Sequence, residues 1–301
     1  MRTDDDSWDI VTGVGATALG VAAMRAAESR RPDALFHDPY AEQLVSAVGL
    51  PGWRKLVSGD VSGLDAEIAR VYGPLGGFLV ARTCYFDDYF DTASAAGVRQ
   101  IVILAAGLDA RAYRLDWPDS ATLFELDQPK VLEFKASALA RACPAVDRRE
   151  VAVDLRQDWP TALREKGFDP QAPTAWLAEG LLRYLPSDAQ DRLFENVVAL
   201  SAPGSRFAAN HTSDTPNPDR LRAGRSRMMA TLGIDVDLTD LWYPAEGRSD
   251  PVDWFAAQGW TTDRTGPMAV LADRGRAVPE DITDEMMSQT LMTAIRGDST
   301  R

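Results

Sequence analysis

The sequence predicts an α/β protein in which a mostly parallel sheet of seven strands, the last of them antiparallel, carries helices on both faces and follows a helical N-terminal cap. Three observations predict this class. Alanine and leucine recur at helical spacing in the first third, short apolar runs separated by helical stretches begin after residue 100, and no internal repeat occurs. Because strands that alternate with helices are joined by crossovers, the sheet is expected to be mainly parallel.

The first third of the chain is predicted to be helical over residues 12–29, 39–48 and 63–92. The stretches LPGW and SGDVSG separate these helices and contain the glycine, proline and serine that mark turns. No alternation of apolar and polar residues typical of a strand occurs there. We therefore assign residues 1–95 to the helical cap.

Seven apolar runs in the rest of the chain are predicted to be strands. They are IVILAA (101–106), TLFEL (122–126), EVAVDL (150–155), TAWLAE (174–179), SRFAAN (205–210), GWTTDR (259–264) and QTLMTAIR (289–296). The last strand is expected to hairpin back against the sheet. Residues 212–248, rich in proline, arginine and methionine, are predicted to form a helical insertion near the functional site, within one domain that spans 96–301.

The composition excludes several classes of function. The formal net charge is −13 at pH 7, spread along the chain, so the surface repels a phosphate backbone and nucleic acid is not an expected partner. The first residues are acidic where a secretory signal is basic, and no apolar run approaches the roughly 20 residues of a membrane span. We expect a cytoplasmic protein without a membrane partner. Two cysteines without a CxxC pattern and two histidines predict no metal site.

Acidic residues and a glycine stand at the ends of the predicted strands. Gly107 and Asp109 follow the first strand, Asp127 follows the second, Asp154 closes the third and Glu179 closes the fourth. Ligands of open parallel sheets bind outside the carboxyl ends of the strands, so these residues are candidates for one site. A glycine accepts positive φ and lets a ligand approach the backbone. The stretch AAGLDAR lacks the GxGxxG spacing of pyrophosphate-binding loops, which favours a cofactor without phosphates.

Asp127 lies twenty residues after Gly107, the spacing at which an acid at the end of the second strand binds a ribose diol. Two charge-assisted hydrogen bonds, at about 1.5 to 3 kcal/mol each, would supply a large part of the roughly 8 kcal/mol that binds a micromolar ligand. An aspartate followed by Gln128 and Pro129 is also typical of the cap of the next helix. The spacing alone leaves both roles open.

Six stretches carry a resemblance to a known family. They are HDPY (37–40), ARTCYFDDYF (81–90), ILAAGLDARAYRL (103–115), FELDQP (124–129), VAVDLR (151–156) and AEGLLRYLP (178–186). In this order they resemble the class I S-adenosylmethionine-dependent methyltransferases of the leucine carboxyl methyltransferase family, and its mycobacterial-type branch most closely. The resemblance implies a Rossmann-like methyltransferase sheet and S-adenosyl-L-methionine as cofactor. It does not identify the substrate, because the C-terminal third matches less distinctively.

The resemblance implies which residues hold the methionine end of the cofactor. Arg82 would meet the methionine carboxylate, Gly107 would pass the methionine moiety over its backbone, and Glu179 would bind near the amino group. Arg25 would be the counterpart of a basic N-terminal residue that reaches the cofactor. Without the family, Arg82 could be a solvated residue that pairs with an aspartate on its own helix, and Glu179 could be an acid at a helix N-terminus.

The same resemblance implies that three residues bind the nucleoside end of the cofactor. Asp127 would hold the ribose, and Asp154 would accept a hydrogen bond from the adenine amino group, with Leu155 against the ring. The structural alternative for Asp154 is to cap the turn before the sequence DWP. One arginine and three carboxylates complement the charges and donors of S-adenosyl-L-methionine, so the residue types agree with these roles.

No strong constellation for a catalytic base occurs, and the catalytic residues are left open. His37 stands in a predicted turn, whereas His211 ends the fifth predicted strand and is the candidate that could face an acceptor. The basic stretch RLRAGRSR (220–227), with Arg222 and Arg225, could bind an anionic acceptor or form a solvated face.

Three functions are compatible with the sequence. The first is O-methylation of a carboxylate or an acidic hydroxyl on a small molecule, because a carboxylate arrives ionised and needs no base, whereas a hydroxyl gains from one. The second is a non-catalytic protein that binds S-adenosyl-L-methionine and regulates a partner. The third, an NAD(P)-linked oxidoreductase, is disfavoured by the absence of GxGxxG and of a Tyr-x-x-x-Lys pair. The oligomeric state is open.

Overall fold

A computed structural model describes residues 10, 15–50, 52–53, 57, 66–212, 223, 226–227, 230, 241–243, 245–277 and 287–297, with the backbone alone over 66–74. The described chain forms a seven-stranded sheet in the order β3-β2-β1-β4-β5-β7-β6. The strands are β1 (Gln100–Leu104), β2 (Thr122–Asp127), β3 (Asp147–Ala152), β4 (Thr174–Ala178), β5 (Arg206–Thr212), β6 (Trp260–Thr265) and β7 (Gln289–Arg296).

The sheet is parallel except at β7, which runs antiparallel to both of its neighbours, β5 and β6. The number of strands and the antiparallel last strand are as predicted, so the predicted α/β class is confirmed. Because the chain returns through helices between the parallel strands, the carboxyl ends of β1, β2, β3, β4 and β5 gather at one edge of the sheet. That edge is the place where a ligand is expected.

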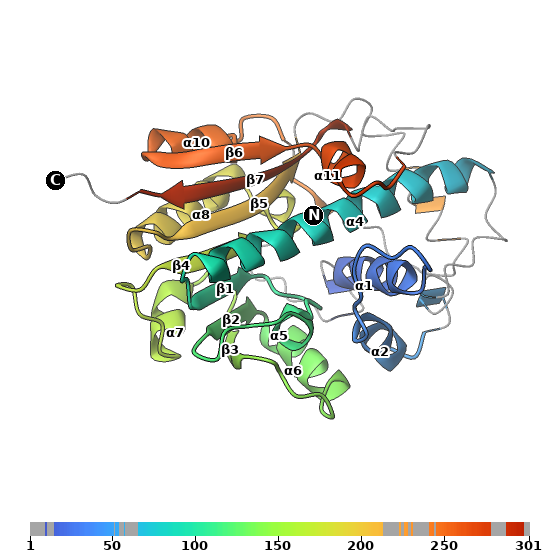
Figure 1. The fold of residues 1–301 in the computed structure, drawn as a ribbon, viewed down its shortest axis with the longest axis horizontal. Helices are drawn as coiled ribbons and strands as arrows, with labels where there is room; N and C mark the ends of the chain where they lie inside the picture. Colours follow the sequence, from blue (N-terminus) through green and yellow to red (C-terminus); the bar gives the residue numbers. More distant parts are fainter. Residues whose placement is uncertain are drawn as a thin grey trace.

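Helices cover both faces of the sheet (Figure 1). One face carries the long helix α4 (Ala66–Ala95) together with α1 (Gly15–Ser29), α2 (Ala41–Ala47), α5 (Arg111–Arg114), α6 (Pro129–Ala138) and α11 (Pro267–Asp273). The other face carries α7 (Trp159–Glu165), the 3₁₀ turn η1 (Leu182–Tyr184), α8 (Ser187–Ala199) and α10 (Pro251–Ala257). None of the described helices combines the length and the hydropathy that a membrane span requires.

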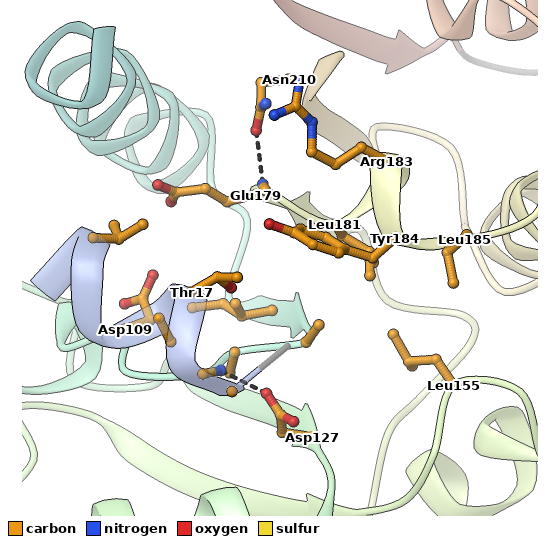
Figure 2. Close-up of a pocket in the computed structure, with 18 of the residues that line it drawn as sticks. Thr17, Asp109, Asp127, Leu155, Glu179, Leu181, Arg183, Tyr184, Leu185 and Asn210 are labelled. Carbon is orange, nitrogen blue, oxygen red and sulfur yellow. Dashed lines mark hydrogen bonds between the residues drawn. The ribbon is translucent and has the colours of Figure 1, made fainter. Parts of the chain in front are cut away.

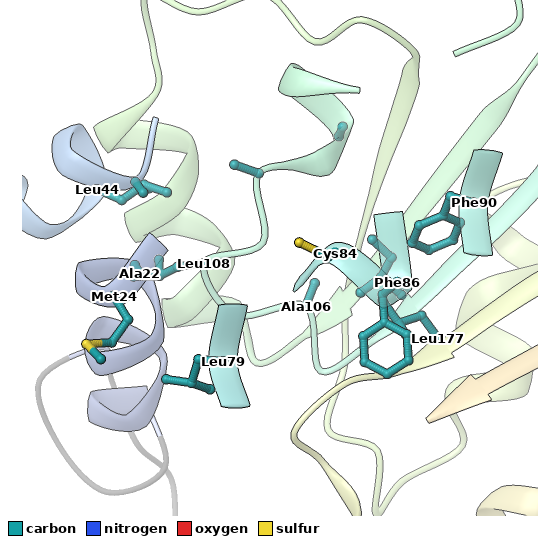
Figure 3. Packing of buried hydrophobic residues seen from close by; sticks show 14 of the residues in the cluster. Ala22, Met24, Leu44, Leu79, Cys84, Phe86, Phe90, Ala106, Leu108 and Leu177 are labelled. Atoms are coloured by element: carbon teal, nitrogen blue, oxygen red, sulfur yellow. The ribbon is translucent and has the colours of Figure 1, made fainter. Parts of the chain in front are cut away.

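Two hydrophobic clusters, one on each face of the sheet, hold these layers together. On the face of α4, a single cluster extends from Phe86, Phe90 and the sheet residue Leu177 to Leu44 of α2 (Figure 3). On the opposite face, Trp159 of α7 and Phe194 of α8 belong to the cluster under the sheet. The boundary predicted between the helical cap and the rest of the chain, at residue 95, coincides with the end of α4. The first cluster contains residues from both sides of this boundary and joins the N-terminal helices to the sheet.

The third strand lies three residues earlier than the apolar pattern predicts, at Asp147–Ala152 instead of 150–155. Its partners explain the shift. Arg148 donates to Glu125 of β2, and the fully buried ammonium of Lys135 lies 2.8 Å from the same carboxylate. β3 is the edge strand beside β2, and its first residues are charged because Arg148 forms a buried ion pair with Glu125 of β2. The apolar Val153 therefore lies after the end of the strand.

The predicted helical insertion at 212–248 falls mostly outside the described residues. Within it, residues 223, 226–227 and 230 are helical. Arg222 and Arg225 of the basic stretch, predicted to bind an anionic acceptor or form a solvated face, lie outside the described part of the chain.

Candidate active site

A cavity of about 740 Å³ opens at the carboxyl edge of the sheet, a volume within the usual range of small-molecule sites. Its lining comes from the helices α1, α4 and α8, from the segments that follow β1, β2, β3 and β4, and from residues of β5 and β7. Figure 2 shows part of this lining. All of the predicted cofactor-binding residues line it: Arg25, Arg82, Gly107, Asp127, Asp154, Leu155 and Glu179. Residues far apart in sequence thus meet where the strand-end pattern placed them.

The turn after β1 brings the backbone against the cavity. Gly107 has a φ of +51°, a conformation that other residues rarely adopt, and a Cβ at this position would lie 3.2 Å from the Cβ of Ala18 on α1. The backbone N–H of Gly107 donates to Oδ2 of Asp127 over 2.6 Å. The glycine is therefore required both by its φ and by the close approach of α1, and its N–H fixes the carboxylate at the end of β2.

Asp127 is held by the backbone and is almost completely buried. Its Oδ1 accepts a hydrogen bond of 2.7 Å from the backbone N–H of Gln128, and its Oδ2 accepts the bond from Gly107. Burial raises the pKa of Asp127 to about 6, although the two backbone hydrogen bonds oppose that rise. Two of the roughly four lone-pair positions of the carboxylate are used, which leaves acceptor capacity for a ligand.

The capping role considered for Asp127 is not what the structure shows. Gln128 occupies the N-cap position of α6 with Pro129 in the first turn, and its side chain makes no capping hydrogen bond. Asp127 instead ties the end of β2 to the turn after β1, and both segments line the cavity.

Arg82 and Glu179 form a buried ion pair across the cavity wall. The Nε of Arg82 on α4 lies 2.8 Å from Oε1 of Glu179, which follows β4. In the described part of the chain this Nε has no hydrogen-bond partner with suitable geometry. Arg82 thus does not pair with Asp87 or Asp88 on its own helix, the alternative that its helical position left open. A buried guanidinium with an unsatisfied N–H is a group that a carboxylate ligand could satisfy.

Sequence patterns missed Arg111, which organises the acids of this wall. Its guanidinium donates to Glu179 and to Asp87, each over 2.7 Å, and it also donates to Asp109. Burial acts to lower the pKa of Arg111, but the surrounding carboxylates outweigh it and hold that pKa well above its usual value. The sequence could have indicated Arg111, because several acids predicted at one buried edge of the sheet need positive charges beside them. The stretch ARAYR, which contains Arg111, directly follows the turn after β1.

Arg25 of α1 fastens the N-terminal helix to the same turn. Its Nη2 donates to the backbone oxygen of Leu108 over 2.6 Å, and its Nε donates to Asp38 over 2.8 Å. Asp38 belongs to the HDPY stretch, where its Oδ1 also accepts from the backbone N–H of Tyr40 and Ala41. Arg25 lines the cavity, and its hydrogen bonds hold the wall in place.

Asp154 and Leu155 follow β3 and line the cavity, and Figure 2 shows Leu155 opposite Leu185. Asp154 accepts hydrogen bonds from the backbone and the side chain of Arg156 and one of 3.0 Å from Nε2 of Gln128. Burial acts to raise the pKa of Asp154, but the bonds from Arg156 outweigh it and lower that pKa. The turn-capping alternative is therefore present in the structure, and an adenine amino group would have to share this carboxylate with Arg156.

His211 lies outside the lining of the cavity. Its Nε2 is 3.9 Å from Oδ2 of Asp250, at the start of α10, and burial lowers the pKa of the imidazole against the opposing effect of that aspartate. Successive residues of a strand point to opposite faces, so it is the preceding residue, Asn210, that lines the cavity. The structure thus separates His211 from the candidate site. His37 is exposed and also lies outside the lining.

Comparison with known proteins agrees with this geometry. The leucine carboxyl methyltransferase family matches residues 18–198 of the chain. A protein of Mycobacteroides abscessus named "Putative S-adenosyl-L-methionine-dependent methyltransferase" is 51% identical over 290 residues, which cover 94% of this chain and 95% of the relative. The chain belongs to the leucine carboxyl methyltransferase family. It is an S-adenosyl-L-methionine-dependent methyltransferase, and not the oxidoreductase or the non-catalytic binding protein that the sequence alone left open.

Two further similarities extend this result. A protein of Mycobacterium avium with the same name is 50% identical over 304 residues, covering 100% of this methyltransferase and 96% of the relative. A DUF574 family protein of Streptomyces avermitilis has a TM-score of 0.51 at 14% identity, over 91% of this chain and 96% of that one. At so low an identity the second similarity concerns the fold alone.

The cavity of this family member fits S-adenosyl-L-methionine by its chemistry. The cofactor carries a carboxylate, an ammonium, a sulfonium and a ribose diol. The wall offers a guanidinium with an unsatisfied N–H at Arg82, a carboxylate at Glu179, and a carboxylate with free acceptor positions at Asp127. A glycine at the tip of the turn after β1 leaves room for close approach. The donor set and the open backbone therefore suit the cofactor that the family uses.

Proposed function

We propose that this methyltransferase transfers a methyl group to an oxygen of a carboxylate, or of an acidic hydroxyl, on a small molecule. One observation carries the proposal. The described lining of the cavity contains no histidine, lysine or cysteine, and His211 lies outside it. The acids of the lining are held by arginines at Asp109, Asp154, Glu179 and Asp188, and by backbone N–H groups at Asp127. An acceptor that must lose a proton gains about 10²- to 10⁴-fold from a positioned base, whereas a carboxylate is already ionised at neutral pH. The name of the family, which refers to a carboxyl acceptor, agrees with this choice.

The cofactor-binding roles proposed for the lining residues divide the cavity into two ends. At the methionine end, Arg82 binds the carboxylate and Glu179 the ammonium, with the backbone of Gly107 against the chain between them. At the nucleoside end, Asp127 accepts hydrogen bonds from the ribose diol and Leu155 packs on the adenine. Asp154 accepts from the adenine amino group while it keeps Arg156 as a neighbour. Arg25 acts indirectly, because it holds the backbone of the turn after β1 through Leu108.

The residues of this chain contribute mainly position to the reaction. Bound S-adenosyl-L-methionine supplies an electrophilic methyl group with a leaving group that needs no acid. The protein then has to hold the acceptor oxygen in line with that methyl group and exclude water. Aligned reactants can recover about 7 to 11 kcal/mol of the barrier. The carboxylates of Asp127 and Glu179 also favour a cationic cofactor, because opposite charges attract more strongly in a buried cavity.

Transfer of tritiated methyl from S-adenosyl-L-methionine tests the proposal. The acceptors are offered as matched sets that share one carbon skeleton and differ in the reacting group: carboxylic acid, phenol, primary alcohol, amine and thiol. Methyl esters from the acids, or methyl ethers from the phenols, are expected. Base-labile release of methanol identifies the esters. Methylation that occurs only on amines, thiols or carbon would contradict the proposal, whereas the family assignment would stand.

A further inference from the structure

We infer that Arg183, Asn210 and Gln289 form a binding site for the carboxylate of the acceptor, so that one wall of the cavity selects anionic acceptors. The inference rests on the proposed carboxyl methylation and names the residues that give the enzyme its substrate class. All three residues line the cavity, from η1, β5 and β7 respectively. Figure 2 shows Asn210 and Arg183 close together, with Asp109 and Asp127 on the other side of the cavity.

Asn210 lines the cavity with an amide whose oxygen is already used. Oδ1 accepts a hydrogen bond of 2.7 Å from the backbone N–H of Gly180. An N–H donor requires the oxygen of the amide as its partner, so the orientation of this amide is determined. Asn210 is 7% exposed, and in the described part of the chain its nitrogen has no partner. A buried N–H group that faces a cavity without an acceptor is a place for one.

Gln289 is oriented in the same way through Thr212, its partner in the pairing of β5 with β7. The hydroxyl of Thr212 accepts from Nη2 of Arg183 over 2.7 Å and donates to Oε1 of Gln289 over 3.2 Å. The oxygen of this amide is thus also occupied by the protein. Gln289 is 3% exposed, and no described residue accepts from its nitrogen. Both residues therefore line the cavity with amides whose oxygens are occupied, so that a ligand there would meet their N–H donors.

Arg183 adds a positive charge with a defined orientation. The centre of its guanidinium lies 3.9 Å from the centre of the Trp242 ring, and the bond to Thr212 directs one edge of the group toward β5. A guanidinium stacked on an aromatic ring can donate through its edges to a planar acceptor such as a carboxylate. The backbone oxygen of Arg183 accepts from the N–H of Tyr243, which fixes η1 against the next segment of the wall.

The cavity carries acids and donors on different sides. Asp109 and Asp127 stand on the side of β1 and β2, which suits the cation of the cofactor (Figure 2). Arg183 and Asn210 stand on the opposite side (Figure 2), and Gln289 lines the cavity from β7. A carboxylate on these donors is separated from Asp109 and Asp127, and Glu179, which adjoins Gly180, is paired with Arg82 and Arg111. A neutral acceptor such as an amide would bring its own N–H donors against the donors of this wall.

Two variants test the donor wall. Asn210→Asp keeps an oxygen for the N–H of Gly180 and replaces the amide nitrogen with a second acceptor of the same shape. Arg183→Gln removes the charge together with the hydrogen bond from Nη2 to Thr212. Arg192→Gln is the matched control, because Arg192 lines the same cavity but pairs with Asp188 on an exposed surface. Each variant is first titrated with S-adenosylhomocysteine, whose affinity is expected to stay within about threefold of the wild type.

The decisive measurement is the binding of benzoate, phenylacetate and hexanoate, and of the corresponding carboxamides, to protein saturated with S-adenosylhomocysteine, followed by ligand-observed NMR. The acids are expected to bind and the amides not to bind. Asn210→Asp and Arg183→Gln should weaken binding of the acids about tenfold or more, as expected for loss of a charge-assisted hydrogen bond, and Arg192→Gln should not. The inference is overturned if no acid binds, if acids and amides bind alike, or if both variants bind acids as the wild type does. The methyl-transfer panel is separate: esters formed equally by wild type and Asn210→Asp would leave carboxyl methylation standing and refute this wall.

Discussion

Lowering the pH through 6 is expected to weaken the binding of S-adenosylhomocysteine, because the proposed ribose ligand Asp127 becomes protonated. Burial raises the pKa of this carboxyl to about 6, and its two backbone hydrogen bonds come from N–H groups that require acceptor oxygens. A protonated carboxyl carries a hydrogen where the ribose diol needs an acceptor. The ionised form is therefore the one that binds the nucleoside.

The magnitude follows from the fraction of Asp127 that is ionised. With a pKa of about 6, roughly nine tenths of the molecules are ionised at pH 7 and roughly one tenth at pH 5. If only the ionised form binds, the affinity falls about tenfold between these pH values, or about 1.4 kcal/mol. Stability of the unliganded protein has the opposite dependence. A carboxyl whose pKa is raised on folding stabilises the protein below pH 4, and this contribution, about 3 kcal/mol, is lost as the pH rises through 6.

The assay is calorimetric titration with S-adenosylhomocysteine at pH 5, 6, 7 and 8, in buffers of different ionisation enthalpy. Release of close to one proton per site is expected at pH 5 and none at pH 8. Asp127→Ala is the control: its affinity should be low and nearly independent of pH in this range. An affinity of the wild type that stays constant between pH 5 and pH 7, or a pH dependence that persists in Asp127→Ala, would refute the role of Asp127.

Three further predictions concern other residues of the site. Arg111→Gln removes the counter-charge that Asp87, Asp109 and Glu179 share, and it should lower the free energy of unfolding by about 3 to 5 kcal/mol in urea titrations. Arg192→Gln, in an exposed pair, should change that free energy by less than about 1 kcal/mol. Equal effects of the two variants would contradict the buried network. Gly107→Ala should cost about 1 to 2 kcal/mol in thermal unfolding, because alanine is strained at a φ of +51° and meets Ala18, and wild-type stability of this variant would count against that geometry. Asp154→Ala should weaken S-adenosylhomocysteine about tenfold but leave S-inosylhomocysteine, which lacks the adenine amino group, unchanged; an equal loss for both ligands would show that Asp154 acts only through the turn with Arg156.

The sequence predicts the fold well wherever apolar pattern and strand burial coincide. Among the five parallel strands β1 to β5, four begin and end within two residues of the predicted positions: β1, β2, β4 and β5. Their residues are mostly buried on both faces of the sheet, so each strand is a continuous apolar run in the sequence. Strand β3 is the exception. It is an edge strand whose residues pair through Arg148 with Glu125, so hydrophobicity marks its end and not its beginning.

The lining of the cavity was predictable where residue type and strand position act together, as at Asp127 and Glu179, whereas their roles toward a cofactor stay predictions. Arg111 was missed because it serves three carboxylates that are far apart in sequence, and only the fold shows that they meet. The prediction of His211 failed for a different reason. His211 and Asn210 both lie near the end of β5, and residue type alone favours the histidine as the residue that faces an acceptor. Because successive side chains of a strand alternate between its faces, it is Asn210 that lines the cavity. Gln289 joins it only through the antiparallel pairing of β7, which no local pattern reveals.

Two of the three residues of the proposed acceptor wall lie beyond the part of the chain that the family match covers. The residues proposed to hold the cofactor fall within 18–198, as does Arg183, whereas Asn210 and Gln289 lie on β5 and β7. Substitutions at Asn210 or Gln289 can therefore alter the acceptor without touching a residue proposed to hold the cofactor. A chimaera that joins residues 1–200 of this enzyme to the C-terminal third of a relative is expected to keep its affinity for S-adenosylhomocysteine and to change its choice of acceptor where the relative differs at the positions of Asn210 and Gln289.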